Sequence, residues 1–297
     1  MHSWLSIEAD DSEKLAGAAT VDADAVVVDL AAVPMDETAE AVRDAVVDWL
    51  IEFADPFACE KPFARWVRIK PTDTPLWRED LVAVMRGAPD GVVLPKVCGP
   101  DDMRRLASEL YEIEQALGLK HNSTKIMPQI GETPRAALML AEMTSDPQPR
   151  LTAFTWNADR LLHNLKARRS HDSSGEWTGV PQHVRSMTIL LAKAMGVMAI
   201  DTAPKAESDH HAVLRHADAA RQDGFSGSFA RGPQQTAAIN QAYAITMQDR
   251  QEAENQLRAA KKAFIAPKQA IERDESFAAE QQAMMDAEKP VKPRAIF

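Results

Sequence analysis

The stretch GVVLPKVCGPDDMRRLASELYEIEQAL, residues 91–117, joins a short apolar run to a long segment with a helical pattern. Seven more runs, each followed by a helical pattern, occupy residues 3–8, 24–30, 64–70, 124–130, 151–156, 197–202 and 227–230. Buried parallel strands are continuous apolar runs, and alternation of strand and helix is typical of a parallel sheet. The sequence therefore predicts eight β-then-α units.

Eight such units favour one closed architecture. A (β/α)₈ barrel takes about 250 residues, and the chain has 297, which leaves room for an extension. The alternative is an open, doubly wound sheet. No G-x-G-x-x-G motif follows the first apolar run, which weakens a dinucleotide-binding interpretation. We therefore expect an α/β protein, a (β/α)₈ TIM barrel.

The pattern changes after Tyr243. Residues 247–264 form a charged helical pattern, Pro267 interrupts it, and a second helical pattern follows. We expect a barrel over residues 1–246 and a C-terminal helical extension over residues 247–297. An amphipathic extension must bury its apolar positions, so it packs on its own barrel or on a neighbouring subunit.

Composition excludes several classes of protein. A net charge of −10 disfavours nucleic acid as a partner. No stretch approaches the ~18 apolar residues of a membrane span, and the first residues do not resemble a signal peptide. Cys59 and Cys98 lie far apart without metal-ligand spacing, which predicts a reducing, cytoplasmic location.

One loop is long for a compact domain. Residues 166–180, KARRSHDSSGEWTGV, are polar and follow the sixth strand and its helix. Loops of this length are usually functional or mobile. The sequence places it on the side of the barrel where active sites are built.

Reactive residues of such barrels lie at the C-terminal ends of the strands. Arg68 ends the third run, and its planar guanidinium suits a carboxylate or a phosphate. Glu132 follows the fifth run and suits a hard cation such as Mg²⁺. For each, an ion pair at the barrel rim is an equally good interpretation. For Lys96 and Asp201 the ion pair is favoured.

Several ordered motifs resemble those of one family. They are SWLSIEADDSEKLAGAA (3–19), ADAVVVDL (23–30), WVRIKPTDTPLWREDL (66–81), DGVVLPKV (90–97), GETPRAAL (131–138), TAFTWNADRL (152–161), MAIDT (198–202) and DGFSGSFARGPQQTAAINQAY (223–243). In their order and spacing they resemble citrate lyase β-subunit-like proteins of the HpcH/HpaI aldolase superfamily. The resemblance covers residues 2–245.

The resemblance implies both chemistry and assembly. Members are barrels, usually trimers or hexamers, that hold Mg²⁺ on two carboxylates. They cleave or form carbon–carbon bonds of oxo- or hydroxy-acids, often as CoA or acyl-carrier thioesters. Arg68 matches the family's substrate-carboxylate arginine, with Lys70 where the family has asparagine. Glu132 matches the first metal ligand, and Glu272 loosely matches an aspartate of the C-terminal lid.

This sequence also departs from the family pattern. Ala31 and Ala32 replace two acids after the second strand. In the segment from Asn157 to Leu161, Arg160 stands at the position of the second metal-ligand aspartate. Arg231 stands where the family has the isoleucine of an I-H-P segment, so its histidine is absent.

Three functional hypotheses follow. The first is a carbon–carbon lyase, an aldolase in type, whose metal site keeps Glu132 and recruits Asp159 from beside Arg160. The second is a non-catalytic member that serves as a ligand-binding or partner subunit. A Schiff-base aldolase using Lys96 is a third interpretation. The resemblance favours an enzyme that acts on a small carboxylic acid or an acyl-CoA, in a homo-oligomer.

These hypotheses name the candidate residues. The catalytic candidates are Arg68, Glu132, Arg160 and Glu272; the substrate-binding candidates are Arg68, Lys70, Asn157 and Arg160; the metal ligands are Glu132 and Asp159. Because a guanidinium repels a dication, we expect weak Mg²⁺ binding or none, with a Glu132–Arg160 ion pair in the metal's place.

Overall fold

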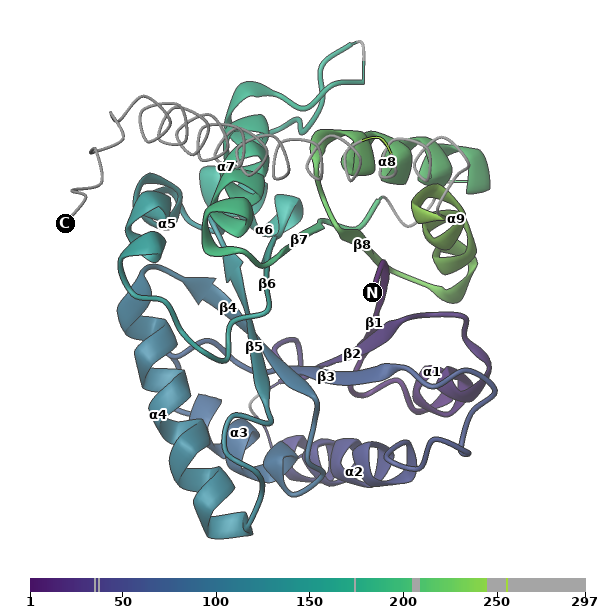
Figure 1. Cartoon of the computed structure of the whole chain (residues 1–297), viewed down its shortest axis with the longest axis vertical. Coiled ribbons are helices and arrows are strands. Elements are labelled where there is room, and N and C mark those ends of the chain that lie inside the picture. Colours follow the sequence, from purple (N-terminus) through teal and green to yellow (C-terminus); the bar gives the residue numbers. More distant parts are fainter. Residues whose placement is uncertain (35, 37, 174, 205–208, 245–254, 256–297) are drawn as a thin grey trace, which may run out of the picture. The chain divides into compact units, whose positions relative to one another are not determined.

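In a computed structural model of the chain, eight parallel strands close into a barrel in the order β1-β2-β3-β4-β5-β6-β7-β8, with helices around it (Figure 1). The structure describes residues 1–34, 36, 38–173, 175–204, 209–244 and 255. The strands are β1 (Ser3–Glu8), β2 (Ala25–Asp29), β3 (Ala64–Arg68), β4 (Gly91–Val97), β5 (Lys125–Ile130), β6 (Ala153–Trp156), β7 (Met198–Asp201) and β8 (Gly227–Ala230). The predicted (β/α)₈ barrel is confirmed.

Helices connect the strands and form the outer layer. They are α1 (Ser12–Gly17), α2 (Ala39–Glu52), α3 (Trp77–Met85), α4 (Pro100–Leu117), α5 (Pro134–Leu138), α6 (Ala158–Leu165), α7 (Gly179–Met195), α8 (His210–Asp223) and α9 (Pro233–Tyr243). Two 3₁₀ helices, η1 (Ala18–Thr20) and η2 (Leu140–Ser145), complete the described elements. No helix among the described residues is long and apolar enough to cross a bilayer.

The chain divides into two compact units, Met1–Tyr243 and Ala244–Phe297. The first contains the whole barrel. The predicted helical extension, and with it Glu272, lies outside the described residues apart from Asn255. The extension and its packing therefore stay predictions.

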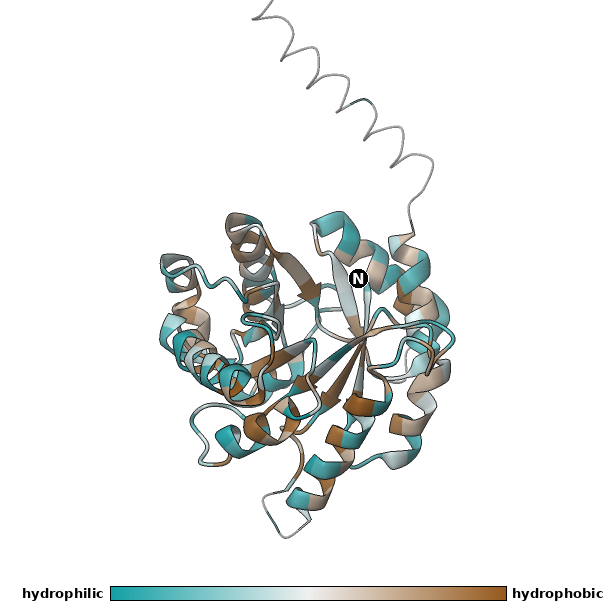
Figure 2. Ribbon diagram, turned by 60° about the horizontal axis from the view of Figure 1, so that its bottom comes forward, coloured by the Kyte–Doolittle hydropathy of each residue, from teal (hydrophilic) through white to brown (hydrophobic). Residues whose placement is uncertain are grey.

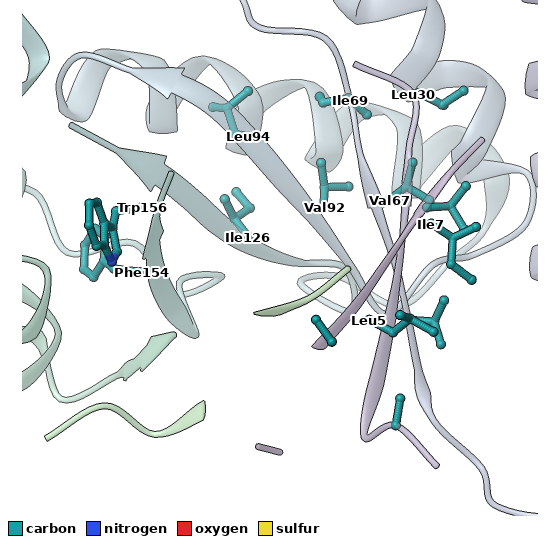
Figure 3. Close-up of a cluster of buried hydrophobic side chains, with 14 of the residues drawn as sticks. Leu5, Ile7, Leu30, Val67, Ile69, Val92, Leu94, Ile126, Phe154 and Trp156 are labelled. Carbon is teal, nitrogen blue, oxygen red and sulfur yellow. The ribbon is translucent and has the colours of Figure 1, made fainter. Parts of the chain in front are cut away.

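Side chains point alternately outward and inward along the strands, and this produces two hydrophobic cores. Side chains that point outward pack beneath the helices, as Figure 3 shows for Leu5, Ile7, Val67, Val92 and other residues. Figure 2 shows the same layering, with hydrophobic strands and hydrophilic outer helix surfaces. This outer core contains most of the buried apolar side chains.

The inward-pointing side chains form a smaller core inside the barrel. Trp4 of β1 and Trp66 of β3 meet edge to face, with ring centroids 5.2 Å apart. Gly91 of β4 is required beside them, because a Cβ at this position would lie 2.3 Å from the Trp66 ring. These rings fill the middle of the barrel. The polar residues further along the same strands are therefore left to line its C-terminal mouth.

Candidate active site

Two adjoining cavities occupy the C-terminal mouth of the barrel. The larger, which we call the mouth cavity, has a volume of about 460 Å³. The smaller, the side cavity, has a volume of about 250 Å³. Arg68 and Arg160 line both cavities. Asn157 and Asp159 line the mouth cavity, and Glu132 lines the side cavity.

Arg68 is fixed by a carboxylate from the neighbouring strand. β2 and β3 pair in register with Asp29 beside Arg68, and both side chains point into the barrel. Arg68 Nε donates to Asp29 Oδ1 at 2.9 Å, and Arg68 Nη2 donates to Asp29 Oδ2. Arg68 Nη1 also donates to Gln129 Oε1 at 3.3 Å. The guanidinium is held rigidly, and its remaining N–H groups are available to a ligand.

Glu132 is a buried acid with neutral hydrogen-bond partners. Gln129 Nε2 donates to Glu132 Oε1 at 2.8 Å, and the backbone N–H of Lys96 donates to Glu132 Oε2. Burial raises the pKa of Glu132 above its ordinary value, against the lowering effects of the Lys96 N–H and of the charges on Arg68 and Arg160. A carboxyl group in this state suits the transfer of a proton.

The backbone around Glu132 is shaped for this arrangement. The pairing of β4 with β5 shifts register between Leu94 and Val97, and Lys96 has a left-handed φ of 55°. This bulge turns the Lys96 amide towards Glu132. Gly131 has φ +69°, and a Cβ there would lie 2.5 Å from the Val184 side chain. The turn that presents Glu132 therefore requires glycine.

Arg160 and Asp159 start helix α6. The side chain of Asn157 accepts a hydrogen bond from Arg160 N at 3.1 Å, which makes it the N-cap of this helix. Asp159 forms an ion pair with Arg231 rather than turning towards Glu132. Within the described part of the chain, the guanidinium of Arg160 has no hydrogen bond or ion pair.

Two local expectations are corrected. The predicted Glu132–Arg160 ion pair is not formed between these two described residues, so that expectation is wrong. The carboxylate is already satisfied by Gln129 and Lys96, so Arg160 is left facing the cavities. Lys70 lines neither cavity, because its ammonium donates to Leu30 O at 3.0 Å and lies 3.5 Å from buried Asp80.

Lys96 and Asp201 have different surroundings. The Lys96 side chain is 47% exposed, and its Nζ lies 3.7 Å from Asp73. It therefore lacks the dry pocket that makes a lysine amine nucleophilic, which disfavours the Schiff-base interpretation. Asp201 is buried and accepts hydrogen bonds from Trp156 Nε1 and from Arg185. It is part of the ion-pair framework of the barrel wall.

Sequence reasoning did not select the residues that hold the site in place. Asp29 fixes Arg68, Gln129 links Arg68 to Glu132, and Asn164 Nδ2 donates to Glu132 O at 2.8 Å. The alternation of side chains along β2 indicates that Asp29 points into the barrel, because it lies two residues after the inward-facing Val27. Asn164 had no such signal, because it reaches the site from a helix.

The donor set does not fit a Mg²⁺ ion held by two carboxylates. Both Glu132 oxygens accept hydrogen bonds, Asp29 is bound by Arg68, and Asp159 is bound by Arg231. A permanent cation, Arg160, lines the same cavity as Glu132. Among the described residues, no group of three or more His, Cys, Asp or Glu side chains could hold a metal ion.

Comparison with known proteins gives a consistent result. Residues 3–233 match the family model described as HpcH/HpaI aldolase/citrate lyase. Citrate lyase subunit beta of Haemophilus influenzae is 29% identical over 195 residues, which are 65% of this chain and 64% of that protein. A citrate lyase subunit beta-like protein of Mycobacterium tuberculosis is 27% identical over 241 residues, 81% of this chain and 78% of that protein.

Solved structures agree with the fold. Protein CitE of Mycobacterium tuberculosis, in complex with magnesium and acetoacetate, superposes with a TM-score of 0.67 and 26% identity. The match covers 86% of this chain and 97% of that one. The M. tuberculosis citrate lyase beta subunit complexed with oxaloacetate and magnesium gives a TM-score of 0.65, with 82% of this chain and 96% of that one covered.

Proposed function

Because this chain belongs to the HpcH/HpaI aldolase/citrate lyase family, we propose that it binds a small oxo- or hydroxy-acid at the barrel mouth and acts on it as a carbon–carbon lyase. In this proposal the substrate carboxylate is bound by arginine rather than through Mg²⁺. The observation that carries it is the guanidinium of Arg160. It has no partner among the described residues and lines the same two cavities as Arg68.

Substrate recognition follows from the two guanidinium groups. Arg68 is held by Asp29 at a fixed angle, so its free N–H groups present a preorganised donor pair. Arg160 is exposed and adaptable, and it adds a second positive charge. Together they suit a dianion or an oxo-acid with a carboxylate and a carbonyl oxygen. The mouth cavity of about 460 Å³ is in the size range of small-molecule sites.

The proposed bond cleavage needs one proton acceptor and stabilisation of one negative charge. A base removes the hydroxyl proton of a 3-hydroxy acid, and the carbon–carbon bond breaks. Its electron pair leaves on the other fragment as an enolate, which then takes up a proton. Glu132, with its raised pKa, suits the proton transfers, and Arg160 suits the developing oxygen charge.

A non-catalytic, ligand-binding subunit is the second candidate. The observation that favours it is the loss of the paired carboxylates, because Glu132 is the single acid among the described residues that line the side cavity, and Asp159 is paired with Arg231. Without a metal ion the reaction loses Lewis-acid assistance. Both candidates share the same binding site, so binding and turnover have to be measured separately.

Binding is tested first, in EDTA. Oxaloacetate, pyruvate, glyoxylate and acyl-CoA compounds are screened by thermal shift and then by calorimetry. We expect an oxo-acid to bind the parent and to bind Arg160→Gln at least tenfold more weakly. The matched control is Arg105→Gln, an exposed arginine of α4 outside both cavities. Equal binding by all three proteins contradicts the proposed anchor.

Turnover is tested next with hydroxy-acid thioesters, by trapping the released oxo-acid with phenylhydrazine. A lyase releases oxo-acid with the parent, while Glu132→Gln binds the ligand but loses turnover. Binding without release by the parent supports the ligand-binding subunit instead.

The family resemblance also supports a trimer or a hexamer, which light scattering of the full chain tests directly. A monomer contradicts this part of the proposal. The cytoplasmic location, likewise, stays a prediction from the cysteine content.

A further inference from the structure

A second, basic groove lies outside the barrel mouth. It has a volume of about 620 Å³, within the range of small-molecule sites. We call it the outer groove; its lining includes Arg168, Arg169, His171, Trp177, His216 and Arg231. The loop between α6 and α7 supplies one side, and α8 supplies another. Asp159 and Arg231 line both this groove and the mouth cavity, so their ion pair lies between the two spaces.

The loop that forms the groove is internally braced. His171 and Trp177 form an antiparallel bridge, and Asp172 N donates to Glu176 O at 2.8 Å. The Trp177 ring meets the Trp156 ring edge to face, with centroids 5.3 Å apart. In Figure 1 this segment precedes α7 as an extended hairpin. The bracing gives the two arginines before it a defined base.

The charges in the groove are unevenly matched. Arg168 and Arg169 are exposed, and within the described part of the chain neither side chain forms an ion pair or a hydrogen bond. Arg231 is paired with Asp159 and also donates to Pro204 O at 3.0 Å. Asp172 is the remaining acid of the lining. Three arginines therefore face two acids in a protein whose net charge is −10.

We propose that the outer groove binds a phosphate-type anion, a diphosphate or a phosphate ester. Adjacent guanidinium groups give phosphate oxygens parallel, charge-assisted hydrogen bonds. Two unpartnered arginines supply more charge than a monocarboxylate needs. Trp177 and the two histidines add flat surfaces and further donors at the groove wall. The site needs no ligand in the mouth, so it does not rest on the proposed lyase or binding function.

Calorimetric titration with pyrophosphate, in EDTA and without oxo-acid, tests the groove. The decisive variant is Arg168→Ala/Arg169→Ala. The control is Arg105→Ala/Lys120→Ala, which removes the same charge from exposed positions outside the groove. We expect the groove variant to bind at least tenfold more weakly and the control to stay within twofold of the parent. Circular dichroism melting shows that each variant is folded.

Two outcomes overturn the proposal. One is an equal loss of affinity in both double variants, which shows only an effect of net charge. The other is unchanged affinity in the groove variant. A parallel titration with malonate separates phosphate from carboxylate, and binding of malonate as tight as pyrophosphate also overturns the assignment. A pyrophosphate-dependent fluorescence change that disappears in Trp177→Phe supports the location.

Discussion

Buried carboxylates meet arginine differently in the barrel wall and at the barrel mouth. By the wall we mean here the contact of α4 with the chain just before β6, where Glu114 accepts two hydrogen bonds from Arg150, at 2.7 and 2.8 Å, and both residues are buried. At the mouth, Glu132 is also buried, but its partners among the described residues are an amide side chain and a backbone N–H, although Arg68 and Arg160 are near enough to affect its pKa.

The difference separates a structural acid from a functional one. Arginine and backbone hydrogen bonds hold the pKa of Glu114 below its ordinary value, despite the opposing effect of burial, whereas burial raises the pKa of Glu132. Charge on Glu114 therefore stabilises the fold, and charge on Glu132 is a cost that the rest of the barrel offsets. A buried acid without an ion pair among the described residues, near the unpartnered guanidinium of Arg160, is typical of a site that acts on a ligand.

The wall pair should show the largest effect. Arg150→Met leaves the Glu114 carboxylate buried without its partner, and we expect the free energy of unfolding to fall by about 3–5 kcal/mol. Urea denaturation measures it. Arg104→Met, which removes the ion pairs of this exposed arginine with Asp101 and Asp146, is the control and should cost less than about 1 kcal/mol. A wall variant as stable as this control would remove the distinction between the two regions.

Variants of the two mouth arginines should differ in their effects on stability and on ligand binding. Arg68→Ala leaves Asp29 buried without its guanidinium, so it should lower both stability and oxo-acid affinity. Arg160→Ala should lower affinity alone, because Arg160 has no described partner to lose. At ~100 times its dissociation constant, a ligand raises the unfolding free energy by about 2.7 kcal/mol. Thermal melts with oxaloacetate should lose this gain in both variants. An unchanged gain in either one excludes it as an anchor.

The smallest effect concerns pH. The raised pKa of Glu132 means that its ionisation destabilises the fold as pH rises through the unfolded and then the folded pKa. Glu132→Gln should therefore be as stable as the parent or more stable at pH 8. The unfolding free energy of the parent should rise relative to that of the variant as pH falls. Glu114 has a lowered pKa, so its contribution is present above the unfolded pKa and is lost as pH falls through the folded value.

Denaturation of both proteins between pH 4 and pH 8 measures this dependence. A Glu132→Gln protein that is less stable than the parent at pH 8, and gains relative to it on acidification, would mean that Glu132 is a paired structural acid after all.

The sequence predicted those features of the fold and the site that depend on a single strand. Apolar runs predicted all eight strands, because a buried parallel strand has no polar face. Arg68 and Glu132 were predicted to lie at the mouth because strand ends meet there, and both line its cavities. Lys70 was predicted to bind substrate but lines neither cavity, because its side chain is held beside Asp80 of α3, and contacts between elements leave no local pattern in the sequence.

Contacts between elements also explain why the expected Glu132–Arg160 ion pair was wrong. The match to a family motif placed Arg160 at a ligand position, but it did not reveal that Gln129 and the Lys96 amide already satisfy Glu132. The register shift in β4 that turns this amide is a property of the pairing between β4 and β5. It has no signature in either strand alone.

The central claim is that a guanidinium, rather than a metal ion, supplies the positive charge at this barrel mouth. Calorimetric titration with Mg²⁺ tests it most directly, on the parent, on Arg160→Asn and on Arg160→Asp. We predict no saturable binding by the parent at millimolar Mg²⁺, none by Arg160→Asn, and measurable binding by Arg160→Asp, in which a carboxylate replaces the cation. Tight Mg²⁺ binding by the parent would contradict the account and restore an ordinary metal-dependent lyase.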